Sequence, residues 1–180
     1  TNYDFNLLPA SGAIDAGLDG EDLGTLNHQF TSKSKIMISD IQYFHPVEPD
    51  KEFIKIYNPG PDTIDISGYS ISGGIDFVFP VGSNIKMNEK ITLVHDISLF
   101  PFITGVVYEW TSGKLANDGE MLLLSDSNGI IIDHVFYSAV APWPVYQTED
   151  EYISLISPNL DNHFGTSWFV ALPVKVAEIN

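Results

Sequence analysis

The sequence predicts an all-β protein, an antiparallel β-sandwich of about nine strands with an irregular N-terminal extension. From residue 36 onward, short runs of Ile, Val, Leu, Phe and Tyr are separated by Gly, Pro, Asn and Asp, at intervals typical of sandwich strands. Apolar residues at helical spacing are nearly absent. With 44% hydrophobic and only 18% charged residues, the composition indicates a packed core and not a disordered chain.

Composition divides the 180 residues into three parts. Residues 1–34 are rich in Gly, Asp and Asn without a sustained period, so we expect an extension or linker. Residues 35–172 carry the strands and form the predicted sandwich domain, and residues 173–180 are a C-terminal tail. Because the chain starts at Thr1, we expect it to be a fragment or processed product from which any export signal has been removed.

The expected strands are short and follow one another without intervening helices, which favours antiparallel sheets. They are residues 36–44, 53–57, 63–71, 76–79, 90–95, 106–110, 120–125, 130–137 and 152–156.

The stretch "EFIKIYNPGPDTIDISGY" joins two alternating runs through a Pro-Gly-Pro turn and predicts a hairpin that closes the core. Its alternation places Ile54 and Ile56 toward the core and Lys55 toward water. Glu52 shares the face of the isoleucines. We therefore expect that carboxyl either at the exposed end of the strand or paired.

A second hairpin is predicted in "EMLLLSDSNGIIIDHVFY", where Asn128-Gly129 suits a tight type I′ turn. Both strands are apolar on both faces near the turn. They are therefore expected to be covered on each side, either as central strands or by the N-terminal segment. The predicted core residues are Ile54, Ile56, Ile64, Ile66, Leu122, Leu124, Ile132, Val135 and Trp168.

The charge balance limits the classes of partner. Eight basic residues against 24 acidic ones give a net charge of −16, which disfavours nucleic acid and anionic membranes. The absence of cysteine removes disulfides, thiolate zinc sites and cysteine nucleophiles. No apolar run approaches the ~20 residues of a transmembrane helix.

Two acidic turns, "DSNG" at 126–129 and "DGED" at 19–22, offer oxygen ligands for calcium. An EF-hand loop that begins at Asp126 would need Glu where Tyr137 stands, so that motif is excluded. Ordinary turn chemistry explains the same residues. Weak calcium binding stays open, and no other cofactor is expected.

No catalytic, cofactor-binding or metal-binding residue is predicted, and the chain is not expected to be an enzyme. No G-x-S-x-G motif occurs. The acidic run at 149–151 is typical of a solvated loop, and the glycine-rich "SGG" at 72–74 is typical of a turn. The histidines stand singly, without the spacing of a zinc motif: His28, His45, His95, His134 and His163.

Four large aromatic residues allow two interpretations. Trp110, Trp143, Tyr146 and Trp168 could form a stacking platform for sugar rings, but aromatic residues of β-sandwiches more often belong to the core. We favour the core and keep the platform as the alternative.

Several signatures in order resemble the lamin tail domain, also called the intermediate filament tail domain, over residues 36–168. They are "EFIKIYNPGPDTIDISGYSIS", "FVFPVGSNIKMNEKITLV", "WTSGKLANDGEMLLLSDSNGIIIDHVFYS", "APWP" and "PNLDNHFGTSW". The resemblance implies an immunoglobulin-like sandwich without catalysis. In bacteria, such domains are typically parts of secreted or surface proteins, and their inferred role is interaction or anchoring.

Within these signatures, the resemblance implies fold-determining roles for Asn58, Gly68, Trp110, Gly119, Asp133, Tyr137, Trp143 and Trp168. The loop in "YQTEDEYISL" departs from the family pattern. "NYDFNLLPASGAIDAGLD" followed by "EDLG" resembles the end of a secreted right-handed parallel β-helix protein.

Together these observations predict a non-catalytic interaction, anchoring or spacer module of an exported, bacterial multidomain protein, secreted or at the cell surface. Its expected partner is a protein or a polysaccharide there. A carbohydrate-binding module beside a polysaccharide-acting β-helix domain is the first alternative. Part of a composite enzyme site is the second.

Overall fold

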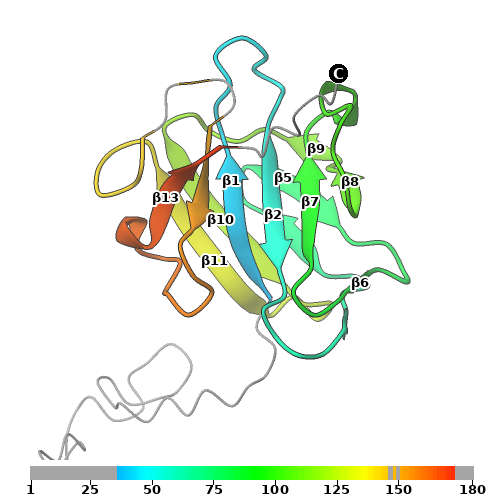
Figure 1. Cartoon of the computed structure of the whole chain (residues 1–180). Helices are drawn as coiled ribbons and strands as arrows, with labels where there is room; N and C mark the ends of the chain where they lie inside the picture. Colours follow the sequence, from blue (N-terminus) through cyan, green and yellow to red (C-terminus); the bar gives the residue numbers. More distant parts are fainter. Residues whose placement is uncertain (1–35, 146–147, 149–150, 173–180) are drawn as a thin grey trace, which may run out of the picture. The chain divides into compact units, whose positions relative to one another are not determined.

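The computed structural model describes residues 36–145, 148 and 151–172, and these residues form two facing β-sheets (Figure 1). The chain divides into two units, Thr1–Lys33 and Ser34–Asn180, and every described residue belongs to the second. In Figure 1, the sheet that contains β1, β2 and β7 lies in front of the sheet that contains β10 and β11. The all-β sandwich predicted from the sequence is confirmed.

The first sheet has six strands in the order β13-β12-β1-β2-β7-β8. Their bounds are β1 Met37–Gln42, β2 Phe53–Tyr57, β7 Lys90–Val94, β8 Val107–Glu109, β12 Tyr152–Leu155 and β13 Trp168–Ala171. All neighbours pair antiparallel except β7 and β8, which are parallel. The expectation of purely antiparallel sheets is therefore wrong at this edge.

The second sheet has five strands in the order β11-β10-β4-β5-β9, and β3 and β6 form a small separate pair. The bounds are β3 Ile64–Asp65, β4 Ser70–Ser72, β5 Ile75–Val78, β6 Asn84–Ile85, β9 Ser112–Gly113, β10 Gly119–Ser125 and β11 Ile131–Ser138. Two short 3-10 helices, η1 Ile97–Leu99 and η2 Gly165–Ser167, interrupt the loops.

The first predicted hairpin is wrong, because β2 does not pair with β3. Instead β2 lies between β1 and β7, while β3 pairs with β6. The expected strand at 63–71 breaks into β3 and β4 because Asp65 Oδ1 accepts the backbone N–H of Ser67 and Gly68 takes a positive φ of 76°. This local turn carries the chain from the small sheet to the five-stranded one.

The second predicted hairpin is confirmed, since β10 and β11 pair along their length. Its turn is not type I′, because only Gly129 has a positive φ, of 80°, while Asn128 does not. The Gly129 N–H donates to the Asp126 carbonyl oxygen, and the Asp126 N–H donates to the carbonyl oxygen of Ile130. This pattern is a type I turn followed by a glycine bulge.

Strand β11 lies at the edge of its sheet, so the expectation that both hairpin strands are central is wrong. Its outer face exposes 56% of Phe136, and Met121 on β10 lies directly opposite and is also exposed. The alternative, in which the N-terminal segment covers this face, falls outside the described residues.

The core lies between the two sheets. Seven of the nine predicted core residues are buried: Ile54, Ile56, Ile66, Leu122, Leu124, Val135 and Trp168. Ile64 is only partly buried because it belongs to the small sheet. Ile132 is also partly buried, because alternation along β11 gives the inward positions to Asp133, Val135 and Tyr137.

A bulge in β1 shapes the outer face of the six-stranded sheet. The register shifts between Ile38 and Asp40, so that Ile38 lies opposite Ile56 while Asp40 lies opposite Lys55. The extra residue, Ser39, lets Ile38 and Ile41 both reach the core. Asp40 is thereby placed on the outer face, beside the candidate site.

Candidate functional site

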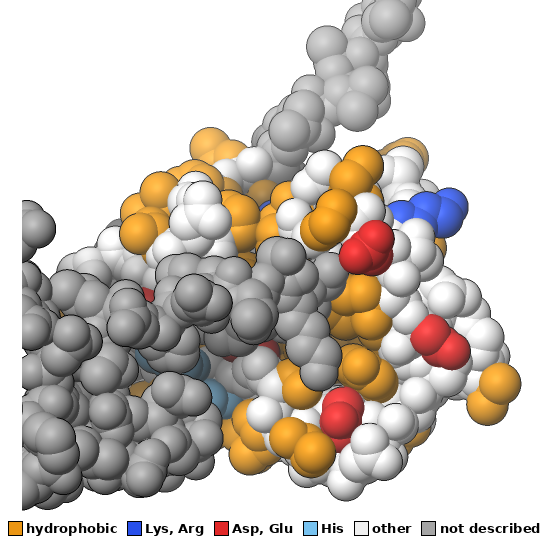
Figure 2. Space-filling model, turned by 90° about the horizontal axis from the view of Figure 1, so that it is seen from below, with side chains coloured by type: hydrophobic (Ala, Val, Ile, Leu, Met, Phe, Trp, Pro, Cys, Tyr) orange, Lys and Arg blue, Asp and Glu red, His pale blue; other side chains and the backbone are white. Residues whose placement is uncertain are grey.

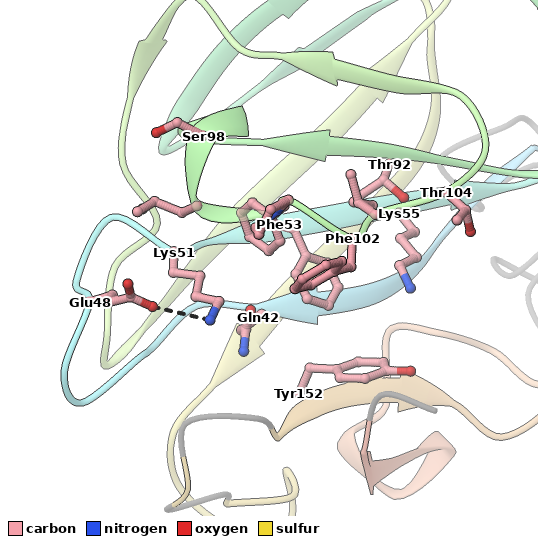
Figure 3. A pocket seen from close by; sticks show the side chains of 14 residues that line it. Gln42, Glu48, Lys51, Phe53, Lys55, Thr92, Ser98, Phe102, Thr104 and Tyr152 are labelled. Atoms are coloured by element: carbon pink, nitrogen blue, oxygen red, sulfur yellow. Dashed lines mark hydrogen bonds and ion pairs between the residues drawn. The ribbon is translucent and has the colours of Figure 1, made fainter. Parts of the chain in front are cut away.

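A pocket of about 710 Å³ lies on the outer face of the six-stranded sheet (Figure 3). We call it the outer-sheet pocket. Its floor comes from strands β1, β2, β7 and β12, and its rim comes from η1, the loop between η1 and β8, and the loop between β1 and β2. The residues that line it are Gln42, Glu48, Lys51, Phe53, Lys55, Thr92, Tyr152 and residues 98–104.

Aromatic rings line the floor and rim. Phe53 packs against Tyr152 with ring centroids 5.2 Å apart at 62°, and against Phe100 at 6.1 Å and 77°. Both are edge-to-face arrangements, which fix ring orientation. Phe102, on the rim, is 93% exposed. An exposed phenyl ring above an aromatic floor is typical of a binding surface.

Lys55 crosses this aromatic floor. Its Nζ lies 5.0 Å from the ring centroid of Phe53 and 5.2 Å from that of Tyr152, within the range of cation–π attraction. Burial lowers the pKa of Lys55, an effect that the negative charge of Asp40 opposes. The expectation that Lys55 faces open water is therefore wrong, because its neighbours on the outer face build a pocket around it.

The carboxylate of Asp40 is committed elsewhere. Its Oδ2 lies 2.6 Å from Lys90 Nζ, and its Oδ1 accepts the Ser154 hydroxyl at 2.9 Å. Among the described residues, the ammonium of Lys55 forms no hydrogen bond or ion pair. A cation that is partly buried, lies over aromatic rings and makes no direct ion pair can receive an anionic ligand group.

The rim loop is held by local polar contacts. Asp96 caps η1, because its Oδ1 accepts the backbone N–H and the hydroxyl of Ser98 at 2.9 and 2.6 Å. The N–H of Ile97 donates to Glu109 Oε2 at 2.9 Å. At the other end of the pocket, Lys51 Nζ pairs with Glu48 at 3.1 Å, drawn as a dashed line in Figure 3.

The tryptophans proposed as a sugar platform lie in the core. Trp110, Trp143 and Trp168 are 4%, 8% and 4% exposed, and the last two rings pack 5.6 Å apart. They cannot present a face to a ligand, so the platform hypothesis is wrong for these three residues and the favoured core interpretation holds. Tyr146 falls outside the described residues.

The acidic turn at 126–129 is a structural turn. Asp126 Oδ1 accepts the backbone N–H groups of Asn128 and Ile130 at 2.8 and 2.9 Å. The turn at 19–22 and residues 149 and 150 fall outside the described part of the chain. Within that part, no group of three His, Asp or Glu side chains is placed to hold a metal. On the face drawn in Figure 2, acidic side chains stand singly among hydrophobic and polar ones.

The fold brings two of the scattered histidines together. His134 and His163 stack with ring centroids 4.0 Å apart, and His163 Nδ1 lies 2.9 Å from Asp161. His95 stacks on Trp110, and His45 is buried. His28 falls outside the described residues. The turn expected at 72–74 is confirmed, since Gly73 and Gly74 connect β4 to β5 with positive φ at both glycines.

Glu52 is fully buried at the start of β2, so the exposed alternative is wrong and the paired one is right. Its Oε2 accepts the backbone N–H of Leu115 at 3.0 Å, while its Oε1 has no hydrogen-bond partner. Burial raises the pKa of Glu52 to about 7, and the Leu115 N–H only partly offsets this effect. Glu52 therefore belongs to the structural core and does not line the pocket. Its raised pKa makes the stability of the fold depend on pH.

Two other buried polar residues tie loops and sheets together. Asn58 donates from Nδ2 to the carbonyl oxygens of Asp62 and Ile85, and its Oδ1 accepts the Gly60 N–H. Asp133 Oδ2 on β11 accepts the Ile38 N–H of β1 at 2.7 Å and the Asn162 side chain at 2.9 Å. Both therefore hold the fold, as the resemblance implied.

Sequence reasoning missed the outer-sheet pocket. Its residues look ordinary by pattern: Phe53 and Lys55 are alternate positions of one strand, and Tyr152 begins another nearly 100 residues later. One signal was present, namely the run "LFPFITG" at 99–105, which places two phenylalanines in a loop. An aromatic-rich loop is unusual on a charged surface and points to binding.

Comparison with known families gives the class of the domain. The fold is an immunoglobulin-like β-sandwich, and the Lamin Tail Domain family model matches residues 29–139. The chain therefore belongs to the lamin tail domain family. Domains of this family are generally non-enzymatic. No curated protein matches the chain.

The family match ends before the last two strands. Strand β12 pairs with β1, and β13 pairs with β12, so both complete the six-stranded sheet beyond residue 139. Tyr152 of the pocket comes from this part. Among the described residues, no helix is long and apolar enough to cross a membrane.

Proposed function

We propose that this domain is a non-catalytic interaction and anchoring module of an exported multidomain protein, and that it binds its partner through the outer-sheet pocket. The observation that supports this proposal is the pocket itself. It is lined both by the exposed ring of Phe102 and by the aromatic floor under Lys55. Binding energy at such sites comes from a few buried aromatic and cationic anchors. The proposal requires no cofactor and no metal.

A carbohydrate-binding role is the second candidate, and the lining of the pocket favours it. The exposed ring of Phe102 and the partly buried ring of Tyr152 offer apolar faces, while Thr104 supplies an exposed hydroxyl group at the rim. This combination of a largely apolar lining with a few polar groups is typical of sites for small ligands. The tryptophan platform plays no part in this version.

The first prediction concerns retention by polysaccharides. In native gels that contain polygalacturonate, alginate, xylan or hydroxyethyl cellulose, we expect at least one polymer to retard the chain. Phe102→Ala should abolish most of that retardation, because it removes an exposed ring of the pocket. Phe164→Ala is the matched control, since Phe164 is also exposed, at 62%, and does not line the pocket.

Equal retardation of the two variants would place binding elsewhere on the surface. Free migration of the parent chain in all four gels would argue against a polysaccharide. The Phe102 and Phe164 variants would then be compared for binding to proteins of the cell surface.

A further inference from the structure

We propose that the outer-sheet pocket selects an acidic sugar, namely a uronic acid residue of a polysaccharide, whose carboxylate pairs with the ammonium group of Lys55. The inference rests on the pocket being the binding site of the proposed function. It adds the chemical class of the ligand and the residue that recognises it.

The charge distribution carries the first step. The chain has a net charge of −16, and the other ammonium groups at or beside the outer face are already paired: Lys51 with Glu48, and Lys90 with Asp40. Lys55 alone among these three forms no ion pair within the described residues. An anion in the pocket therefore meets one unpaired cation, where an ion pair is strengthened by partial burial.

The setting of Lys55 carries the second step. Its Nζ lies over the buried ring of Phe53 and the partly buried ring of Tyr152, so a carboxylate that reaches it lies beside the ring of Tyr152. A uronic acid has this form, because its carboxylate is attached directly to a ring with apolar C–H faces. Thr104 adds an exposed hydroxyl group to the lining of the same pocket, where it can bond a sugar hydroxyl.

The rival ligand is an acidic peptide. Repulsion by the net charge of −16 acts on both ligands alike, so the two differ in shape. A peptide carries its carboxylates on flexible stems, whereas a polyuronate carries each carboxylate on a ring that can lie against Tyr152 and Phe102 of the pocket. The pocket volume of about 710 Å³ is in the range of sites for ligands of a few rings.

The test is calorimetric titration of the full chain with tetragalacturonate. Fully methyl-esterified tetragalacturonate is the matched neutral ligand, because it keeps rings and linkages but loses the charges. We expect Lys55→Met to weaken tetragalacturonate binding at least about tenfold and Lys55→Arg to retain it. Lys86→Met is the control, since Lys86 is exposed, away from the pocket and without an ion pair among the described residues.

Equal affinity for the esterified ligand, or equal loss in the Lys55 and Lys86 methionine variants, would overturn the inference. Tetra-aspartate that competes as strongly as tetragalacturonate would overturn the sugar assignment. If tetragalacturonate does not bind while another polymer is retained in a Phe102-dependent way, the ligand class is wrong and the proposed function stands. If retention never depends on Phe102, both fail.

Discussion

Replacing Asp133 by Ala should lower the free energy of unfolding by about 3 to 5 kcal/mol. Asp133 Oδ2 accepts the N–H of Ile38 from the opposite sheet and the side-chain N–H of Asn162. Without the carboxylate, these two donors would stay buried with one acceptor fewer. Each such loss costs about 1 to 3 kcal/mol, and more when the lost acceptor is charged.

Urea unfolding followed by tryptophan fluorescence measures this effect, with an unchanged m-value showing that both variants unfold the same surface. Asp118→Ala is the control, because Asp118 is exposed and its side chain makes no hydrogen bond within the described residues. Asp133→Asn should fall between the two, since its amide oxygen still accepts the Ile38 N–H. Superimposed curves for the Asp133 and Asp118 alanine variants would show that the contact between the sheets is unimportant.

Replacing Glu52 by Gln should stabilise the protein at pH 8 by about 1 to 3 kcal/mol and leave its stability at pH 4 nearly unchanged. Burial raises the pKa of Glu52 from its ordinary value of 4.5 to about 7 in the folded protein. One pKa unit corresponds to about 1.4 kcal/mol. The contribution of this group is fully present below about pH 4.5 and is lost as the pH rises through about 7.

The measurement is the difference in unfolding free energy between parent and Glu52→Gln at several pH values from 4 to 8. Asp118→Asn removes the same unit of negative charge at an exposed site, so it corrects for the general self-repulsion of a protein with net charge −16. A pH-independent difference would mean that the pKa of Glu52 is the same in the folded and the unfolded chain.

The elements that could be predicted are those with a local signal. The β10–β11 hairpin follows from alternation around Asn128-Gly129, and the isoleucines of β2 follow from a period of two. The turn type could not be predicted, because the side chain of Asp126 organises it through backbone N–H groups. The pairing of β2 with β1 and β7 depends on partners far apart in sequence, which local alternation does not specify.

The site was harder to predict than the fold. Lys55 reads as a solvent-facing residue by alternation, and it does lie on the outer face. That face becomes a pocket because the loop with Phe102 and Tyr152 on β12 border it. Both are remote from Lys55 in the sequence. The partner of Glu52 was easier to predict. Glu52 shares the alternating face of the isoleucines, and a carboxyl that is buried there needs a hydrogen-bond partner.

The central claim is that the outer-sheet pocket is the binding site of this lamin tail domain, and chemical-shift mapping tests it most directly. Isotopically labelled chain would be titrated with tetragalacturonate while the backbone amide signals are followed. We predict that the largest shifts gather at residues 53–55, 98–104 and 152 and disappear in Phe102→Ala but not in Phe164→Ala. Shifts centred on the outer face of β10 and β11, or unaffected by the Phe102 substitution, would contradict it.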